Sequence, residues 1–201
     1  MRKDFISSAI GMLVLTLVCG ILYPLLVTGV SQVAFHSKAN GSQLFVKGKL
    51  VGSALIGQAF TTAKGAPLTQ YFQTRPSGTD PADNDAATEF ANYGPNSTIT
   101  EKAIAANIST YITLNGKYYP GGLTAAKVPV DAADTSASGV DPDISVLNAH
   151  IQAYRVAAVR HLSLATVDGL VSKYTTHRGL GFSGEPGVDV LELNLALNRL
   201  S

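Results

Sequence analysis

Residues 5–35 read FISSAIGMLVLTLVCGILYPLLVTGVSQVAF and contain no charged side chain. Leu, Val, Ile and Gly dominate the stretch from Ile10 to Val30. About 20 such residues cross the hydrocarbon core of a bilayer as an α-helix, and a charge at its centre would cost several kcal/mol. The stretch therefore predicts a single transmembrane helix.

A cleaved signal peptide is the competing interpretation of the same residues. Its apolar core usually has about 7–15 residues and ends at a small-x-small cleavage site. The run here is longer, and the candidate site Val27-Thr28-Gly29 fits poorly. We therefore expect residues 1–36 to form a cytoplasmic stub and a retained anchor, and residues 37–201 to form one domain.

Basic residues near the ends of the span predict its orientation. Arg2 and Lys3 flank the short N-terminal side, which the positive-inside tendency keeps in the cytoplasm. Lys38, Lys47 and Lys49 on the other side weaken this bias without reversing it. We expect a single-pass protein in contact with membrane lipid, in the inner membrane with a periplasmic domain if the source is a bacterium.

Three residues of the span bear on its packing. Ser7 and Gly11 have small-xxx-small spacing, which lets a second transmembrane helix approach closely, although such pairs also arise by chance. Pro24 removes one backbone hydrogen bond and is expected to bend the helix. Contact with a partner helix is therefore a hypothesis.

The composition suits one compact domain beside this anchor. The chain has 201 residues, 46% of them hydrophobic and 14% charged. Its formal net charge is +1, and removing Arg2, Lys3 and Asp4 leaves 13 basic and 13 acidic residues. Such a balanced surface predicts no nucleic-acid partner. The single cysteine, Cys19, lies in the apolar run, so we expect the domain to hold together without a disulfide.

A hairpin and a long irregular stretch are predicted after the anchor. Residues 44–46 and 50–51 flank Lys47-Gly48-Lys49 and predict a β-hairpin around a glycine turn. Residues 61–96 are rich in Gly, Pro, Asp, Asn and Thr. So long an irregular stretch is usually functional or disordered.

Three helices follow from apolar residues at helical spacing. Thr98 to Glu101 has the pattern of a capping box and precedes Ile104, Ile108, Tyr111 and Ile112. The other two helices are expected over residues 145–162 and 164–174. Their predicted apolar faces comprise Leu147, Ile151, Tyr154, Ala158 and Leu162 in the second helix, and Val167, Leu170, Val171 and Tyr174 in the third.

The C-terminal residues 188–197 allow two interpretations. Their apolar residues alternate like a strand, while Asp189 and Glu192 have capping-box spacing. We favour a short strand before Asp189 and a closing helix after it, with Leu193 and Leu197 facing the core. The mixture of elements predicts an α/β or α+β domain with short strands.

No pattern in the chain predicts catalytic residues or a metal site. Asp80, Asp83 and Asp85 cluster like a calcium loop, but Asp85 stands where that loop needs glycine. Ser136, Ser138 and Gly139 could offer backbone amides to a nucleotide phosphate, although short Ser/Gly strings are mostly flexible turns. The histidines lack the spacing of a zinc helix site and are expected to be ordinary surface residues: His36, His150, His161 and His177.

Several segments, taken in order, resemble one family of bacterial transport proteins. They read VGSALIGQAF at residues 51–60, YFQTRPS at 71–77, VPVD at 128–131, ASGVDPDIS at 137–145, GEP at 184–186 and VLELNLAL at 190–197. In this order, behind one N-terminal span, the chain resembles the C subunit of the Kdp-type potassium-transporting P-type ATPase. The motif residues are Gly57, Gln58, Phe72, Arg75, Pro76, Asp141, Pro142, Gly184, Glu185, Pro186 and Asn194.

The resemblance implies a non-catalytic subunit of a four-subunit pump that imports potassium at the expense of ATP. Its partners would be a channel-like potassium-binding subunit, a P-type ATP-hydrolysing subunit and a small fourth subunit. The C subunit would assemble the complex and act as a catalytic chaperone that raises the ATP affinity of the hydrolysing subunit. It would bind no cofactor tightly, since the complex uses the ATP.

The chain departs from the family pattern at residues 91–95 and at Asp143, both expected to lie in loops. The rival hypothesis is an autonomous membrane-tethered hydrolase or ligand-binding domain of the cell envelope. An enzyme of that kind would need a nucleophile with a base, or a metal cluster.

Overall fold

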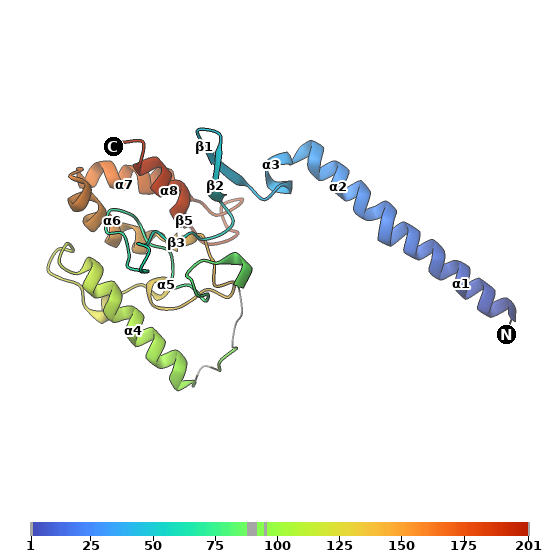
Figure 1. The fold of residues 1–201 in the computed structure, drawn as a ribbon, viewed down its shortest axis with the longest axis horizontal. Helices are drawn as coiled ribbons and strands as arrows, with labels where there is room; N and C mark the ends of the chain where they lie inside the picture. Colours follow the sequence, from blue (N-terminus) through green and yellow to red (C-terminus); the bar gives the residue numbers. More distant parts are fainter. Residues whose placement is uncertain (1, 88–91, 95, 201) are drawn as a thin grey trace. The chain divides into compact units, whose positions relative to one another are not determined.

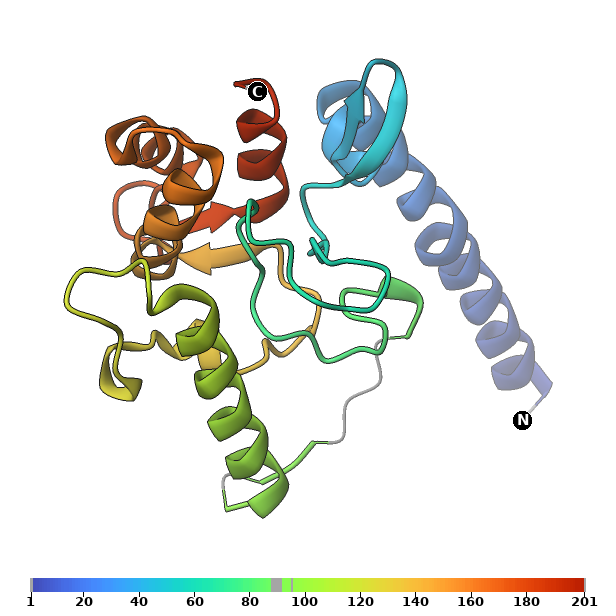
Figure 2. The same cartoon turned by 60° about the vertical axis from the view of Figure 1, so that its left-hand side comes forward.

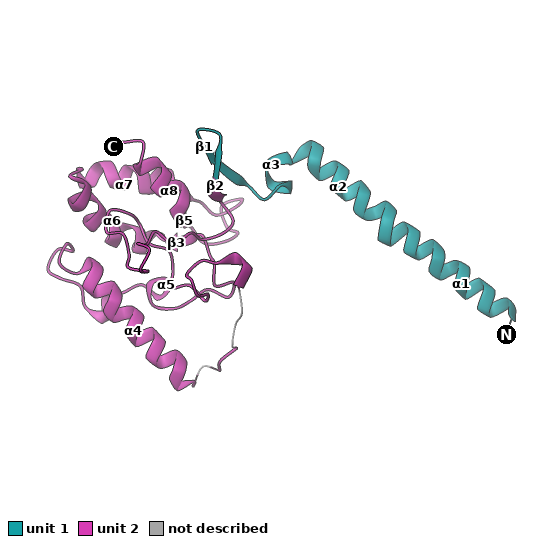
Figure 3. Cartoon of the chain, viewed as in Figure 1, with its two compact units in different colours: residues 1–50 teal, residues 51–201 magenta. Residues whose placement is uncertain are grey.

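The computed structural model describes residues 2–87, 92–94 and 96–200. The chain divides into two compact units, residues 1–50 and 51–201 (Figure 3). The predicted boundary between residues 36 and 37 stays a prediction. Helices and short strands together confirm a mixed domain behind one N-terminal apolar helix (Figure 1).

The first unit begins with one long helix. It consists of α1 (Arg2–Leu17), the π-helical turn η1 (Val18–Leu22) and α2 (Tyr23–Ala34). Together these 33 residues are long and apolar enough to cross a membrane, and their large apolar side chains are exposed in the isolated chain. The π-turn lies directly before Pro24, where the N–H of Tyr23 bonds the carbonyl of Val18. Because proline cannot donate a hydrogen bond, a wider turn before it is the expected distortion.

A short helix and the predicted hairpin follow. α3 (His36–Ala39) leads to β1 (Gln43–Val46) and β2 (Lys49–Ser53), which form a two-stranded sheet. The turn residues Lys47 and Gly48 both have positive φ, 49° and 76°. Two successive residues in this region make the type I′ turn that suits the twist of a hairpin. The hairpin prediction is confirmed.

Among the described residues of the second unit, five α-helices pack around a small antiparallel sheet with strand order β3-β5-β4. α6 lies against α4, α7, β3 and β5, and α8 lies against α7 and β5 (Figure 2). The strands are β3 (Asp143–Ser145), β4 (Thr175–Thr176) and β5 (Gly187–Asp189), the helices α4 (Thr98–Asn115), α5 (Val130–Ala133), α6 (Val146–Arg160), α7 (Leu164–Lys173) and α8 (Val190–Leu197), and the 3-10 turns η2 (Asp85–Ala87) and η3 (Ala125–Lys127).

The closing strand and helix form as predicted. Asp189 ends β5 and caps α8, because its Oδ1 accepts a hydrogen bond of 2.6 Å from the N–H of Glu192. Leu193 and Leu197 are fully buried. They join Val156, Val167 and other residues of α6 and α7 in the main apolar core. Helix α7 also follows its prediction, with Val167 and Val171 in the core.

Two local predictions are wrong. Helix α4 begins at Thr98 after Ser97, and the N–H of Glu101 bonds the carbonyl of Ser97, so the capping box at Thr98 does not form. Asp143, expected in a loop, begins strand β3. The described part of residues 61–96 is irregular apart from η2 and a bridge between Thr61 and Pro67, whereas residues 88–91 and 95 lie outside the described residues.

The predicted apolar face of α6 is wrong in part, although Ile151 is 2% exposed and Leu162 packs against the main core. Leu147 is 59% exposed and Ala158 is exposed, while the polar residues Asn148, Gln152 and Arg155 are buried. Polar side chains can take core positions when their polar atoms are hydrogen-bonded. The side chains of Asn148, Gln152 and Arg155 are hydrogen-bonded to one another. Apolar spacing alone therefore misplaces part of the buried face of this helix.

Two buried amide side chains hold the end of the irregular segment of residues 69–73. Asn194 accepts a hydrogen bond from the N–H of Phe72 and donates one to its carbonyl, both at 2.9 Å. Gln152 does the same for Gln73, accepting at 2.8 Å and donating at 3.0 Å. Each amide makes the two hydrogen bonds that a neighbouring strand would otherwise make, so the buried backbone groups of Phe72 and Gln73 are satisfied.

The guanidinium of Arg155 also holds this segment. Its Nη1 donates to the carbonyls of Thr69 and Tyr71, the latter at 2.8 Å. Its Nε donates to Asn115 Oδ1 at 2.9 Å, and its Nη2 to Gln152 Oε1 at 2.8 Å. Burial lowers the pKa of Arg155 to about 10, so the side chain stays charged at neutral pH. Hydrogen bonds to uncharged oxygen atoms thus stabilise the buried charge of Arg155.

Asn194→Ala should destabilise the domain strongly, because it leaves two buried backbone groups of Phe72 without partners. Each such group costs about 1–3 kcal/mol, so we expect a loss of about 2–6 kcal/mol in the free energy of unfolding. Denaturant titration of the full chain in detergent micelles measures it. Asn92→Ala, at an exposed asparagine, is the control. Equal unfolding midpoints for both variants would contradict this role of Asn194.

Candidate functional site

A cleft of about 200 Å³ lies between the irregular segment of residues 59–82 and helix α4. Arg75 and Pro76, two of the motif residues, stand on its wall. Gln152, which holds Gln73, also reaches the cleft. The other lining residues are Ala59, Thr61, Pro67, Gln73, Thr74, Ser77, Ala82, Asn107, Thr110, Tyr111, Leu114, Asn115 and Ala132.

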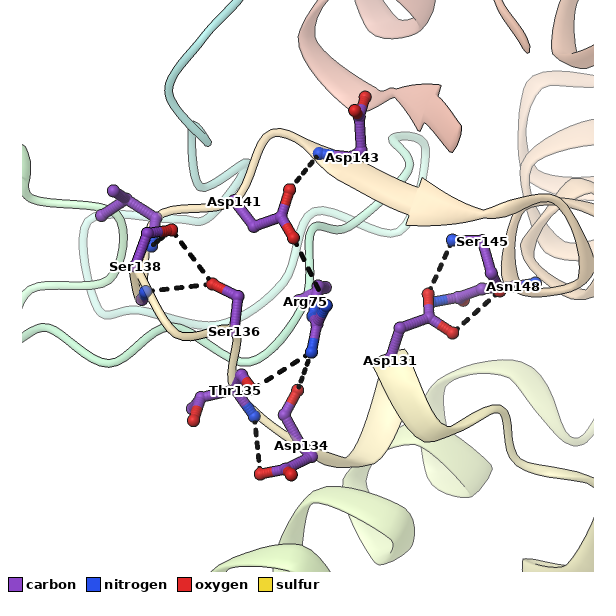
Figure 4. A network of polar contacts seen from close by, with 12 residues as sticks. Arg75, Asp131, Asp134, Thr135, Ser136, Ser138, Asp141, Asp143, Ser145 and Asn148 are labelled. Carbon is purple, nitrogen blue, oxygen red and sulfur yellow. Dashed lines mark hydrogen bonds and ion pairs between the residues drawn. The ribbon is translucent and has the colours of Figure 1, made fainter. Parts of the chain in front are cut away.

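Arg75 connects the cleft wall to the 134–141 loop (Figure 4). Its Nη1 donates to Asp141 Oδ2 at 3.3 Å, and its Nη2 donates to the carbonyl of Thr135 at 3.1 Å. The side chains of Arg75 and Asp141 are 24% and 29% exposed. Among the described residues, the buried Nε of Arg75 has no hydrogen-bond partner. Two motif residues far apart in sequence thus form one ion pair.

Backbone contacts join three motif segments at this place. The N–H of Gly57 donates to the carbonyl of Val140 at 2.7 Å, and Ser77 Oγ donates to the carbonyl of Gly139 at 2.9 Å. A side chain at Gly57 would begin 2.9 Å from the carbonyl oxygen of Asp141, which is too close. Glycine at position 57 therefore lets the two segments approach.

A carboxylate anchors the start of α6 beside this ion pair (Figure 4). Asp131 accepts hydrogen bonds from the N–H of Ser145, the hydroxyl of Ser145 and Nδ2 of Asn148, at 2.8, 2.8 and 2.9 Å. Asn148 in turn accepts from the hydroxyl of Tyr111 and from Gln152 Nε2. Burial raises the pKa of Tyr111, so the hydroxyl is a donor. The network runs unbroken from Asp131 to Arg155.

The Ser136–Gly139 turn, predicted as a weak anion site, uses its own hydroxyls as acceptors. The N–H of Gly139 donates to Ser136 Oγ at 3.0 Å, and the N–H of Val140 donates to Ser138 Oγ at 3.3 Å (Figure 4). A phosphate would have to replace both bonds to use these amides. The nucleotide site stays a prediction, and the geometry favours a turn whose backbone amides bond its own serine hydroxyls.

Two carboxylates stand opposite each other on paired strands. Asp143 of β3 is the register partner of Asp189 of β5. Burial, opposed in part by hydrogen bonds, raises the pKa of Asp189 to about 7, and the charges of Glu192 and Asp143 add to the rise. Burial also raises the pKa of Asp143, with further contributions from Asp141 and Glu192. The carboxyl of Asp189 therefore takes up a proton near pH 7.

The remaining motif residues serve separate parts of the fold. Gln58 Oε1 lies 2.8 Å from the point where a side chain at Gly52 would begin, and the carbonyl of Pro142 accepts a hydrogen bond of 3.1 Å from Val190. Gly184 has a φ of +85°, and Pro186 directly precedes β5. Glu185 pairs with Arg178 at 2.7 Å.

Ser7 and Gly11 both lie on the surface of α1. Gly11 lines a shallow hollow on the surface of α1 together with Ser8, Met12, Leu15, Thr16, Cys19 and Gly20. Ser7 is exposed one helical turn before Gly11. Packing of Ser7 and Gly11 against a partner helix stays a prediction.

The side chains of the described residues do not support metal binding. Among residues 2–87, 92–94 and 96–200, no group of three or more His, Cys, Asp or Glu residues is arranged to hold a metal ion. Asp83, from the predicted acidic loop, instead accepts a hydrogen bond of 3.0 Å from Thr74. His150 pairs with Asp168 at 2.9 Å, a contact that sequence spacing did not predict.

Sequence reasoning missed the residues that carry the network. Asn148, Gln152 and Arg155 were not singled out, although they stand four and three residues apart on one face of α6. A polar stripe at helical spacing, on a helix that also carries alanines and valines, is the signal that could have found them.

Comparison with known proteins assigns the family. A model of the family described as K+-transporting ATPase, c chain matches residues 5–199. A protein of Mycobacterium tuberculosis named Potassium-transporting ATPase KdpC subunit is 44% identical over 200 residues, with 100% of both chains covered. Proteins of the same name from Methylococcus capsulatus and Gemmatimonas aurantiaca are 45% and 44% identical, and the alignments cover 100% and 93% of this chain.

The chain belongs to the KdpC family. The resemblance drawn from the motif segments is thereby confirmed. The protein is an accessory subunit of a potassium-transporting ATPase and not its catalytic subunit. An autonomous envelope hydrolase finds no support in this relationship.

Asp189→Asn should flatten the pH dependence of stability. In the folded wild type the pKa of Asp189 is about 7 against an ordinary value of 3.8, so folding takes up a proton between these values. The contribution of Asp189 to stability is full below about pH 4 and is lost as pH rises through about 7. Melting of the full chain in micelles at pH 5 and pH 8 measures the loss.

Asparagine keeps an oxygen that can cap α8, so the variant tests the charge and not the cap. The wild type should lose more of its melting temperature between the two pH values than the variant does. Asp83, whose pKa burial also raises, is present in both chains and cancels in the comparison, whereas the variant reports Asp189 together with its interaction with Asp143. Equal losses in the two chains would show that Asp189 is ionised in the folded protein at both pH values.

Proposed function

We propose that this chain assembles and stabilises a potassium-importing pump together with a channel-like potassium-binding subunit, a P-type ATP-hydrolysing subunit and a small fourth subunit. The match of residues 5–199 to the family of ATPase c chains carries the proposal. One long apolar helix supplies the means of attachment to the membrane. The buried polar side chains from Asp131 to Arg155 bond one another, which suits a structural partner.

The domain lies outside the cytoplasm in this proposal. Arg2 and Lys3 flank the short N-terminal side of the span, and the positive-inside tendency retains that side in the cytoplasm. The 151 residues of the second unit would then face the periplasm of a bacterium with two membranes.

Any effect on ATP affinity is allosteric in this arrangement. Cytoplasmic ATP and a periplasmic domain are separated by the bilayer, so the domain cannot contact the nucleotide. The amides of Gly139 and Val140, moreover, already donate to serine hydroxyls. A subunit raises ligand affinity at a distance when it binds the ligand-competent state of its partner more tightly than the other state. Contact with the pump through the span and the domain would supply that difference.

External protease should remove the domain from spheroplasts. Cleavage is expected after about Phe35, where the apolar helix has ended, and a short membrane-protected N-terminal fragment should remain. A tag at the N-terminus and an antibody against the C-terminus distinguish the products. Protection of the domain in intact spheroplasts, with cleavage only after lysis, would reverse the topology.

The chain should lower the ATP concentration at which the pump reaches half of its maximal hydrolysis rate. Allosteric couplings typically change affinity about 5–150-fold, so we expect a change in this range between pumps purified with and without the chain. Ser136→Ala together with Ser138→Ala should leave the ATP dependence of the complete pump unchanged. Micromolar ATP binding to the isolated full chain, lost in this double variant, would make the turn a direct nucleotide site.

A further inference from the structure

The long apolar helix has the length of a whole bilayer, headgroups included. Residues 5–34 are helical and uncharged, and at 1.5 Å per residue they rise about 45 Å. A bilayer with its two headgroup regions is roughly 40–45 Å thick. When the helix spans a membrane, the residues after Ala34 therefore emerge at the level of the lipid phosphates.

The residues that emerge there are bonded to the last turn of the helix. The N–H of Ala39 in α3 donates to the carbonyl of Phe35 at 2.8 Å. The side-chain amides of Gln32 and Asn40 bond each other in both directions, at 3.3 and 3.1 Å. Asn40 Nδ2 also donates to the carbonyl of His36 at 2.7 Å. α3 is thus held at the end of α2, in the headgroup layer.

A hollow of about 450 Å³ lies beside α3 and is bounded by the first strand of the hairpin. Its lining residues, all in the first unit, are His36, Ser37, Asn40, Gln43 and Phe45. Volumes of roughly 300–1,000 Å³ are typical of ligand sites. The side chains of Ser37 and Gln43 form no hydrogen bond with the described part of the chain. A hydroxyl and an amide are therefore free to donate to a ligand.

Three exposed lysines belong to the elements that bound the hollow. Lys38 is part of α3, whereas Lys47 and Lys49 are part of the hairpin. None of the three forms an ion pair with any residue that the structure describes. The chain has no acidic residue between Asp4 and Asp80. Because the positive-inside tendency acts against lysines at this end of the span, their uncompensated charge favours an anionic ligand here.

The hairpin adds an apolar face to the same site. The two-residue turn at Lys47-Gly48 places Phe45 opposite Leu50, so the two side chains share one face of the hairpin. Both are 57% exposed. Apolar side chains with lysines beside them are typical of segments that lie in the interface of a bilayer. The wall of the hollow thus continues into a surface that suits acyl chains.

We propose that this hollow binds the headgroup of an anionic phospholipid, in the leaflet through which the chain leaves the membrane. The phosphate accepts hydrogen bonds from Ser37 and Gln43, and the three lysines supply the attraction for its charge. Phe45 and Leu50 lie at the boundary between headgroups and acyl chains. The inference rests on the proposed function, which places the apolar helix across a membrane.

A lipid fits this site better than a free phosphate ion does. The bonds between Gln32 and Asn40 keep the hollow beside the bilayer, where lipid phosphates are concentrated. A free ion would neutralise the lysines but would leave Phe45 and Leu50 in water. A lipid satisfies both the charge and the apolar face, and burying that face adds to its affinity.

The test uses the full chain, which contains no tryptophan. Phe45→Trp places one fluorescent reporter on the wall of the hollow. This chain is reconstituted in phosphatidylcholine vesicles with a minor share of phosphatidylglycerol, and either lipid carries bromine, a quencher, on its acyl chains. We expect brominated phosphatidylglycerol to quench as if its local share were at least fivefold its bulk share, because one lysine near an anionic surface strengthens binding about fivefold.

Two lysine variants of the reporter chain test the origin of this preference. Replacement of Lys38, Lys47 and Lys49 together by Gln should return the local share of phosphatidylglycerol to its bulk share. The control removes the same charge from three exposed lysines of the second unit: Lys64→Gln, Lys102→Gln and Lys173→Gln. The control should keep the preference, and equal melting temperatures should verify that both variants fold.

The other outcomes overturn the inference in distinct ways. Quenching by both lipids at their bulk shares, or by neither, excludes a headgroup site whether or not the lysine variants fold. A preference that inorganic phosphate abolishes assigns the hollow to the free ion. A lysine variant that keeps its lipid preference but no longer copurifies with the other pump subunits assigns the lysines to an acidic protein surface. The proposed function fails separately, when the wild-type chain does not copurify with those subunits.

Discussion

A guanidinium without access to water needs acceptors for its N–H groups. The guanidinium of Arg155 donates to Asn115, Gln152 and the carbonyls of Thr69 and Tyr71. Because an uncompensated buried charge would cost several kcal/mol, these acceptors cannot move away independently. The path of residues 69–73 is therefore set by α6 and not by a sheet. Asn194 completes the arrangement from α8 by bonding both backbone groups of Phe72.

The position of Arg75 on the wall of the cleft follows from this placement. Arg75 comes two residues after Gln73, and the fixed path brings it to Asp141 and the carbonyl of Thr135. Asp131 extends the same network to the first turn of α6. A domain whose polar groups are tied to one another in this way presents stable surfaces to partners, which suits an accessory subunit of a transport ATPase better than a catalytic one.

Sequence patterns predicted the elements that carry an uninterrupted or periodic apolar pattern, and the turn that needs a glycine. The uncharged run became one long helix, Lys47-Gly48 became the hairpin turn, and Leu193 and Leu197 reached the core. The face of α6 was missed because hydrogen bonds, not apolarity, make Gln152 and Arg155 acceptable inside. Strands β3 and β4 have three and two residues, too few for an alternating pattern to be recognised. The motif residues Phe72 and Asn194 were both identified, but nothing in their spacing predicted that they touch.

Amide hydrogen exchange on the full chain in micelles tests the central claim most directly. The N–H groups of Phe72 and Gln73 belong to a segment without strand pairing, yet both donate to buried side-chain amides. They should exchange as slowly as the amides of Val156 and Ala157 in the buried part of α6, because all four would open only with the core. Exchange of Phe72 and Gln73 at the rate of the exposed amides of Asn92 to Gly94 would show that the segment is not held by Asn194, Gln152 and Arg155.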